Sequence, residues 1–235
     1  MTTDIKQNLE HIRTMIEAAV KRAGRDSGSV KLVAVSKTHP VPVLRKAIAA
    51  GAVALGENKV QEAESKIREI GRDAAEWHLI GRLQSNKARK AVQLFDVIHS
   101  VDSLELAERL ERICIEEGRD ELSVFVHVDL AGEETKSGID AHDLPALVEF
   151  LKSCRCLRFD GLMILPPYFE DPEMTRPYFR RLRSIRDGLA ESGVFARGHG
   201  ELSMGMSHDF EVAVEEGATV VRVGTAIFGE REYSQ

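Results

Sequence analysis

The chain has few of the features that mark several large protein classes. Its 235 residues include only three cysteines, Cys114, Cys154 and Cys156. An odd number, with two of them one residue apart, does not make a disulfide framework, and no second pair or nearby histidine completes a zinc site. The eight histidines are scattered without the spacing of a metal motif. We therefore expect reduced cysteines and no metal.

Long apolar runs and an excess of basic charge are also missing. No run approaches the length that crosses a bilayer, and the first residues do not resemble a secretory leader, which predicts a cytoplasmic protein without a membrane partner. The 32 Lys and Arg residues against 38 Asp and Glu residues give a net charge of -6. This balance argues against a nucleic-acid partner, because such proteins neutralise many backbone phosphates. A local basic pocket for one small anion is compatible with it.

What the chain does have is a regular alternation of short apolar runs and amphipathic segments. The runs predict strands over 31–36, 53–56, 77–81, 97–101, 123–130, 159–165, 202–206 and 220–224. The segments predict helices over 41–50, 59–70, 86–94, 104–117, 142–152, 172–192 and 210–216. A further amphipathic helix lies within residues 1–24.

About eight strand–helix units point to an α/β protein with a closed (β/α)8 barrel of the TIM type, forming one domain over residues 1–235. An open doubly wound sheet is the alternative, but it usually carries a glycine fingerprint after its first strand. Here residues 36–40 read Ser-Lys-Thr-His-Pro. Only residues 226–232 remain for the eighth helix, so the N-terminal helix is expected to pack on that part of the barrel.

The C-terminal ends of the strands carry the active site in such barrels, so the residues just after each strand are the candidates. Lys37 follows an apolar first strand, and a desolvated lysine there suits Schiff-base chemistry, although a snorkelling lysine is the ordinary alternative. Ser203 and Ser207 flank Gly205 after the seventh strand, with Ser207 a natural N-cap for the next helix. Gly224-Thr225 follows the eighth strand.

Loops after strands seven and eight form the usual phosphate cradle of this fold. Because the barrel closes, Lys37 is expected beside Gly224 and Thr225. An amine next to a phosphate cradle suggests a phosphorylated aldehyde, and both pyridoxal 5′-phosphate (PLP) and sugar phosphates qualify. Arg222 discriminates between them if it points inward, because it would meet the pyridine nitrogen and keep it unprotonated. On the outer wall it would form a surface ion pair instead.

Several longer motifs occur in order along the chain. They include VAVSKT at 33–38, GENKVQE at 56–62, WHLIGRLQSNK at 77–87, LSMGMS at 202–207 and VRVGTAIFG at 221–229. Together they make the chain similar to the pyridoxal phosphate homeostasis protein family, whose barrel resembles the N-terminal domain of alanine racemase. The positions that match the family's cofactor site are Lys37, Asn58, Ser203, Ser207, Arg222, Gly224 and Thr225.

The resemblance implies roles for these residues. Lys37 is the Schiff-base lysine, Arg222 faces the pyridine nitrogen, Asn58 lines the cofactor, and the two serines bind the phosphate with Gly224 and Thr225. It also implies a monomer that buffers PLP or delivers it to PLP-dependent apo-enzymes, without robust catalysis. Near the end of strand five the family more often has Val-Asn, whereas this chain has Val-Asp at 128–129, which puts a carboxylate near the mouth.

Two enzyme functions are the alternatives. A weak amino-acid racemase would need a second base besides Lys37, and Tyr168 in the loop after strand six is the candidate, although a packed loop aromatic is the simpler interpretation. A Schiff-base aldolase would act on a sugar phosphate. Among other motif residues, Glu57, Glu62 and His78 are interpreted as holding loops. Lys136 is either a solvated loop lysine or a secondary amine for aldehydes.

Overall fold

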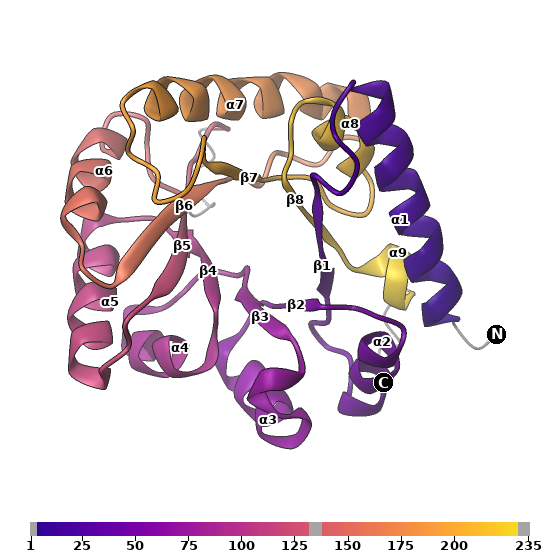
Figure 1. Ribbon diagram of the computed structural model, residues 1–235, viewed down its shortest axis with the longest axis horizontal. Coiled ribbons are helices and arrows are strands. Elements are labelled where there is room, and N and C mark those ends of the chain that lie inside the picture. Colours follow the sequence, from indigo (N-terminus) through magenta and orange to yellow (C-terminus); the bar gives the residue numbers. More distant parts are fainter. Residues whose placement is uncertain (1–3, 132–137, 230–235) are drawn as a thin grey trace.

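The structure is a computed structural model that describes residues 4–131 and 138–229. Eight parallel strands close into a barrel in chain order, with β8 hydrogen-bonded to β1 (Figure 1). The strands are β1 Lys31–Val35, β2 Ala54–Glu57, β3 Glu76–Leu79, β4 Val97–Val101, β5 Leu122–His127, β6 Leu157–Met163, β7 Glu201–Ser203 and β8 Val220–Val223. The predicted fold class is therefore confirmed.

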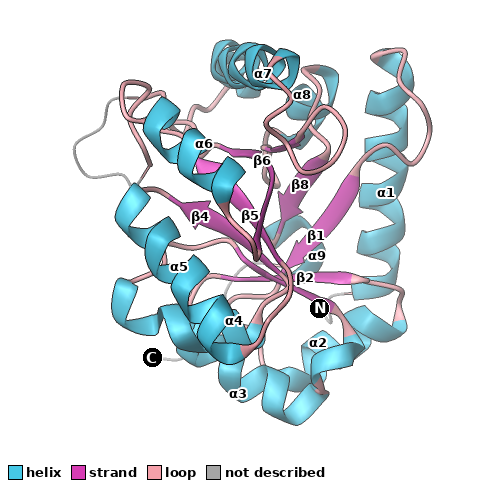
Figure 2. Ribbon diagram, turned by 60° about the vertical axis from the view of Figure 1, so that its left-hand side comes forward, coloured by secondary structure: helices cyan, strands magenta, loops and turns pink. Residues whose placement is uncertain are grey.

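Helices surround the strands, as Figure 2 shows from the side. They are α1 Ile5–Arg22, α2 Val41–Ala49, α3 Val60–Ile70, α4 Ala88–Leu94, α5 Leu104–Glu117, α6 Leu144–Ser153, α7 Arg176–Glu191, α8 Phe210–Glu215 and α9 Thr225–Phe228. Short 3-10 turns occur at Arg72–Ala74, Ser85–Lys87 and Pro172–Thr175. The predicted helix over 172–192 is thus a 3-10 turn followed by α7.

The N-terminal helix takes the place of a long eighth outer helix. With only four residues, α9 is too short to cover the wall by itself. Helix α1 lies against both α8 and α9 (Figure 1) and buries an apolar stripe that includes Leu9, Ile12 and Ile16. Asn8 Nδ2 donates a hydrogen bond to the carbonyl of Ile227 at 2.9 Å. The apolar periodicity of α1 is therefore the sequence signal for this packing.

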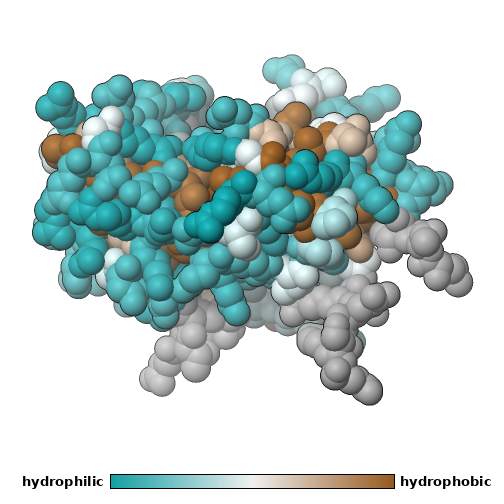
Figure 3. Space-filling model, turned by 90° about the horizontal axis from the view of Figure 1, so that it is seen from below, coloured by the Kyte–Doolittle hydropathy of each residue, from teal (hydrophilic) through white to brown (hydrophobic). Residues whose placement is uncertain are grey.

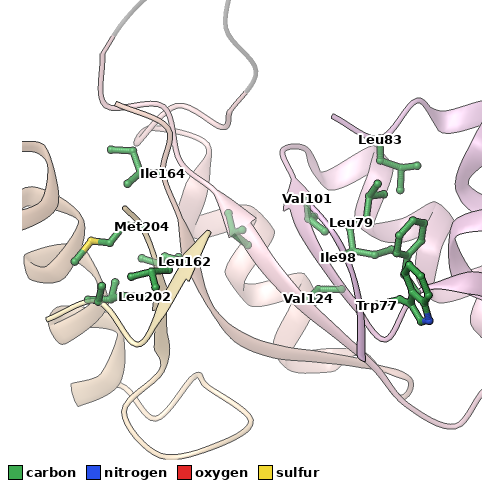
Figure 4. Close-up of a cluster of buried hydrophobic side chains, with 14 of the residues drawn as sticks. Trp77, Leu79, Leu83, Ile98, Val101, Val124, Leu162, Ile164, Leu202 and Met204 are labelled. Carbon is green, nitrogen blue, oxygen red and sulfur yellow. The ribbon is translucent and has the colours of Figure 1, made fainter. Parts of the chain in front are cut away.

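Alternation along the strands divides the core into two layers. One layer lies between strands and helices, and Figure 4 shows Trp77, Leu79 and Ile98 within it. The other fills the barrel and includes Val97 and Phe125. Because neighbouring residues of a strand face opposite sides, the positions between the outer-layer residues point into the barrel. Polar side chains at these inner positions build the site.

On the face seen in Figure 3, hydrophilic residues predominate and hydrophobic ones are exposed in limited areas between them. Among the described helices, none combines the length and apolarity needed to cross a bilayer.

Candidate functional site

A cavity of about 560 Å³ opens at the C-terminal end of the barrel. Six predicted site residues line it, namely Lys37, Asn58, Ser207, Arg222, Gly224 and Thr225. They come from the ends of β1, β2, β7 and β8, which are far apart in sequence and meet because β8 pairs with β1. The barrel closure that places Lys37 beside Gly224 is thus observed.

Charge distinguishes this cavity from the rest of the protein. Lys37, Arg82 and Arg222 line it, and no carboxylate is among its described lining residues, although the whole chain carries a net charge of -6. The apolar side chains of Ile80 and Leu165 form part of the wall. Such a cavity favours an anion with an apolar body.

Lys37 lies two residues after the end of β1, in the turn that follows this strand. Val35, the last residue of β1, and Lys37 both line the cavity, whereas Ser36 between them is buried; Lys37 is half-buried. Thr38 has a φ of +68°, a left-handed conformation that is costly for a β-branched residue. Its backbone N–H donates to Glu62 Oε1 at 2.5 Å, which holds the turn in this conformation.

A buried ion-pair network holds the same turn from behind. Lys66 Nζ donates to Glu57 Oε1 at 2.7 Å, to Glu62 Oε1 at 2.7 Å and to the carbonyl of Ser36 at 2.8 Å. Ser36 Oγ also donates to Glu57 at 2.6 Å. The network therefore ties the residues on both sides of Lys37 to β2 and α3. The interpretation of Glu57 and Glu62 as residues that hold loops agrees with these contacts, whereas Lys66 was missed.

Arg222 points into the barrel and is only 3% exposed. It donates through Nη1 to Ser203 Oγ at 2.6 Å and through Nη2 to the carbonyl of Ile164 at 2.9 Å. Among the described residues, no carboxylate forms an ion pair with it. Desolvation lowers the pKa of Arg222 to about 10, partly offset by Asp209, so it stays charged at neutral pH.

Ser203 and Ser207 have different places from those expected. Ser203 is fully buried and does not line the cavity; its hydroxyl accepts from Arg222 and contacts His99. Ser207 is not a helix cap, because α8 begins at Phe210 after Asp209. Instead its Oγ accepts from the N–H groups of Gly224 at 3.1 Å and Ala226 at 3.4 Å. It therefore joins the loops after β7 and β8 at the cavity.

Glycine shapes the site at two positions. Gly205 has a φ of +93°, and a Cβ there would lie 2.6 Å from Ala213 Cβ. This turn ends β7 at Ser203, three residues before the predicted end. A Cβ at Gly81 would lie 2.3 Å from the carbonyl oxygen of Asn58, so Asn58 keeps its place only beside a glycine.

His127 also lines the cavity and was not singled out from the sequence. Burial, with the charge of Arg222, lowers its pKa to about 4, so it is neutral at pH 7. Tyr168 is 77% exposed and is not among the lining residues; its ring lies 5.5 Å from that of His208, which does line the cavity. Asp129 is outside the lining and accepts from the N–H of Ala131 at 2.9 Å.

The remaining predictions concern Lys136, the cysteines and metal binding. Lys136 lies outside the described residues, so its role stays a prediction. Three free thiols are found at Cys114, Cys154 and Cys156. Among the residues described, no group of three or more potential ligands gathers as a metal site would require.

Comparison with known proteins bears on this geometry. The family model for the alanine racemase N-terminal domain matches residues 6–232. A pyridoxal phosphate homeostasis protein from Aquifex aeolicus (strain VF5) is 43% identical over 227 residues, covering 97% of this chain and 98% of that protein. One from Escherichia coli (strain K12) is 41% identical over 238 residues, covering 99% of both.

Solved structures give the same result. PipY from Synechococcus elongatus PCC7942, with PLP bound, has a TM-score of 0.85 and 41% identity, covering 96% of this chain and all of that chain. Alanine racemase from Clostridium difficile 630 has a TM-score of 0.73 at 18% identity, over 98% of this chain and 58% of that one, which shows the shared fold alone. With high identity over almost its full length, the chain belongs to the pyridoxal phosphate homeostasis protein family, built on the barrel of the alanine racemase N-terminal domain.

Proposed function

We propose that this chain binds PLP in the C-terminal cavity, holds it as a Schiff base on Lys37, and takes part in PLP homeostasis by buffering or delivery. The observation that carries the proposal is the cavity itself, in which an amine, a buried guanidinium and hydroxyl groups converge, with no carboxylate among the lining residues that the structure describes. The PLP bound to PipY, at 41% identity, supports the same ligand.

The donor set fits each part of PLP. Ser207 and Thr225 offer hydroxyl groups for the phosphate, and Lys37 and Arg222 supply positive charge to the cavity. Asn58 offers an amide group at the same wall. Ile80 and Leu165 provide apolar surface for the ring. Ser203 then acts indirectly, by orienting Arg222 through their 2.6 Å hydrogen bond.

When bound, PLP supplies an aldehyde and an electron-accepting ring. The Lys37 amine forms a carbon–nitrogen double bond to the aldehyde carbon, and the aldehyde oxygen leaves as water with the two hydrogens of the amine. Arg222 offers the ring nitrogen only a donor, because an arginine does not give up its proton in proteins. An unprotonated ring is a poor electron sink, so this pairing suits a protein that holds PLP rather than one that transforms amino acids.

Transfer of PLP to apo-enzymes completes the proposal. The cavity opens to the surface and Lys37 is half-buried, so an incoming amine can exchange with it at the Schiff base. We propose PLP-dependent apo-enzymes as the recipients, acting on a monomeric, cytoplasmic donor. Incubation of the loaded protein with an apo-aminotransferase should restore that enzyme's activity faster than spontaneous release of PLP permits.

The test of the proposal is the visible absorption of purified protein after addition of PLP. The wild type should develop a Schiff-base band that free PLP lacks, and Lys37→Ala should lack it. Lys46→Ala, on an exposed face of α2, is the matched control and should behave as wild type. A wild-type protein that gains no band, or a Lys37→Ala variant that keeps it, would refute the proposal.

The racemase alternative requires a second base on the other face of the substrate. Tyr168 is mostly exposed and outside the cavity lining, which does not favour it for this role. In D2O, the PLP-loaded protein should catalyse no more deuterium incorporation at the α-carbon of alanine than free PLP does. Exchange that depends on both Lys37 and Tyr168 would instead support the racemase.

A further inference from the structure

Four buried polar side chains form a continuous chain of contacts through the barrel interior. Arg222 donates to Ser203 Oγ at 2.6 Å, Ser203 Oγ lies 2.8 Å from His99 Nδ1, and His99 Nε2 lies 2.8 Å from His78 Nδ1. All four residues are at most 3% exposed. They come from β8, β7, β4 and β3, so the chain crosses the barrel from one wall to another.

The two ends of the chain lie in different cavities. Arg222 lines the C-terminal cavity, whereas His78 lines a second cavity of about 510 Å³. The second cavity includes the first residues of several strands, among them Lys31, Glu76 and Glu201, so it lies at the N-terminal end of the barrel. The contacts from Arg222 to His78 thus connect the proposed cofactor site with the opposite end of the molecule.

Chemistry at the ends sets the direction of the hydrogen bonds. Arg222 can only donate, so Ser203 Oγ accepts there and keeps its own hydrogen for His99 Nδ1. With Nδ1 accepting, neutral His99 carries its proton on Nε2 and donates it to His78 Nδ1. Burial lowers the pKa values of His99 and His78, which keeps both rings neutral.

His78 is then left with its proton on Nε2, facing Glu76. Nε2 lies 3.3 Å from Glu76 Oε2, a long contact rather than a well-aligned hydrogen bond. The reverse tautomers would turn the Nε2 lone pair toward this carboxylate and leave the Ser203 hydrogen without its histidine acceptor. Glu76 is ionised, because its contact with His78, together with Lys31, lowers its pKa to about 2. Lys31 and Asp96 are the other charged groups acting on His78; Lys31 lowers the pKa of His78 and Asp96 raises it.

We propose that His99 and His78 are positioning residues of a directed hydrogen-bond chain, through which Glu76 at the N-terminal mouth tunes the hydrogen bond that Arg222 offers to the cofactor. The inference rests on the proposed function for its cofactor end. The Glu76 charge polarises each donor in turn, so Ser203 Oγ becomes a stronger acceptor and Arg222 donates less strongly to the cofactor.

The first test needs no cofactor. Nitrogen-15 NMR of histidine-labelled protein at pH 7 should show the Nε2–H tautomer for both His78 and His99. A proton on Nδ1 of His99 would contradict the chain's direction. Because this measurement uses the protein alone, it distinguishes failure of this inference from failure of PLP binding.

The second test titrates the PLP-loaded protein with pH and measures the midpoint of the change in its Schiff-base absorption. Glu76→Gln should lower the midpoint by on the order of half a unit, because less negative charge reaches the cofactor end. Glu201→Gln makes the same charge change in the same cavity, outside the hydrogen-bonded chain, and should leave the midpoint unchanged. Equal shifts in both variants, or no shift in Glu76→Gln, would contradict the proposal.

A third comparison removes the middle of the chain. His99→Phe keeps an aromatic ring against Phe125, on which His99 stacks at 4.5 Å, but it cannot relay a hydrogen bond. In this background Glu76→Gln should no longer shift the midpoint. A shift of the original size would assign the coupling to charge acting through space. If His99→Phe does not fold, the comparison of Glu76→Gln with Glu201→Gln still tests whether the hydrogen-bonded chain carries the effect of Glu76.

Discussion

Gly205 shows how one residue determines the shape of the cavity. Its left-handed φ of +93° turns the chain sharply after β7, and the missing Cβ leaves room for Ala213 and Phe210 of α8. The turn brings Ser207 to the amides of Gly224 and Ala226. A residue with a side chain would meet both a steric and a conformational penalty at this position.

We therefore predict that Gly205→Ala lowers the free energy of unfolding by about 1–3 kcal/mol. Gly188→Ala is the matched control, because Gly188 lies inside α7 with nothing within 4 Å of an added Cβ. The control should raise stability by about 0.5–1 kcal/mol. Urea titrations of the three proteins measure both changes. Similar midpoints for Gly205→Ala and wild type would contradict this account of the turn.

Arg222 and Arg82 offer a second comparison between single residues. Both line the C-terminal cavity, but Arg222 is buried whereas the Arg82 side chain is 73% exposed. We expect Arg222→Gln to weaken PLP binding by about 10- to 100-fold, since a buried charged hydrogen bond contributes about 1.5–3 kcal/mol. Arg82→Gln should change binding by less than about threefold, because water screens it. Absorption titrations with PLP give both constants, and equal losses would argue against the assigned role of Arg222.

At the scale of elements, the Lys66 network joins α3 and β2 to the end of β1. Lys66 and Glu57 are both nearly inaccessible to water, so each charge depends on the other. Lys66→Met should lower the free energy of unfolding by about 3–5 kcal/mol, because it leaves the Glu57 carboxylate buried without its cation. Lys90→Met breaks an exposed pair with Glu64 and should cost less than about 1 kcal/mol. Urea titrations measure the free energy of unfolding of both variants, and equal losses would contradict this account of the Lys66 network.

The stability deficit of Lys66→Met should also depend on pH. Burial raises the pKa of Glu57 above its ordinary value, and the charge of Lys66 opposes that rise. Without Lys66 the folded-state pKa rises further, so the folded variant binds a proton that the unfolded chain has released, and stability falls as pH rises through this window. The deficit should therefore be larger at pH 8 than at pH 5. A deficit that is constant over this range would mean that lost packing, not a buried charge, causes it.

The same elements show what can be predicted from sequence. Apolar periodicity locates all eight strands and identifies α5 as 104–117, because burial imposes those patterns directly. The early end of β7 was missed, since it depends on the space that α8 leaves around Gly205. Lys66 was missed because a lysine four residues after Glu62 looks like a solvated helix pair. Its burial appears only once α3 packs against β2.

At the scale of the whole molecule, the two ends of the barrel differ in charge. The C-terminal cavity is lined by Lys37, Arg82 and Arg222 without a described carboxylate. The N-terminal cavity is lined by five carboxylates, among them Glu76 and Glu201, and by three cations. The closed barrel keeps the ends apart, with the polar chain from Arg222 to His78 running between them. An anionic aldehyde is thus directed to the end at which Lys37 lies.

Borohydride reduction followed by peptide mass spectrometry tests this account most directly. Reduction of the PLP-loaded protein makes the carbon–nitrogen bond permanent, so the modified lysine can be identified. The account predicts one stoichiometric PLP adduct on Lys37, and no adduct when a sugar phosphate replaces PLP. An adduct on another lysine, or efficient trapping of the sugar phosphate alone, would contradict it.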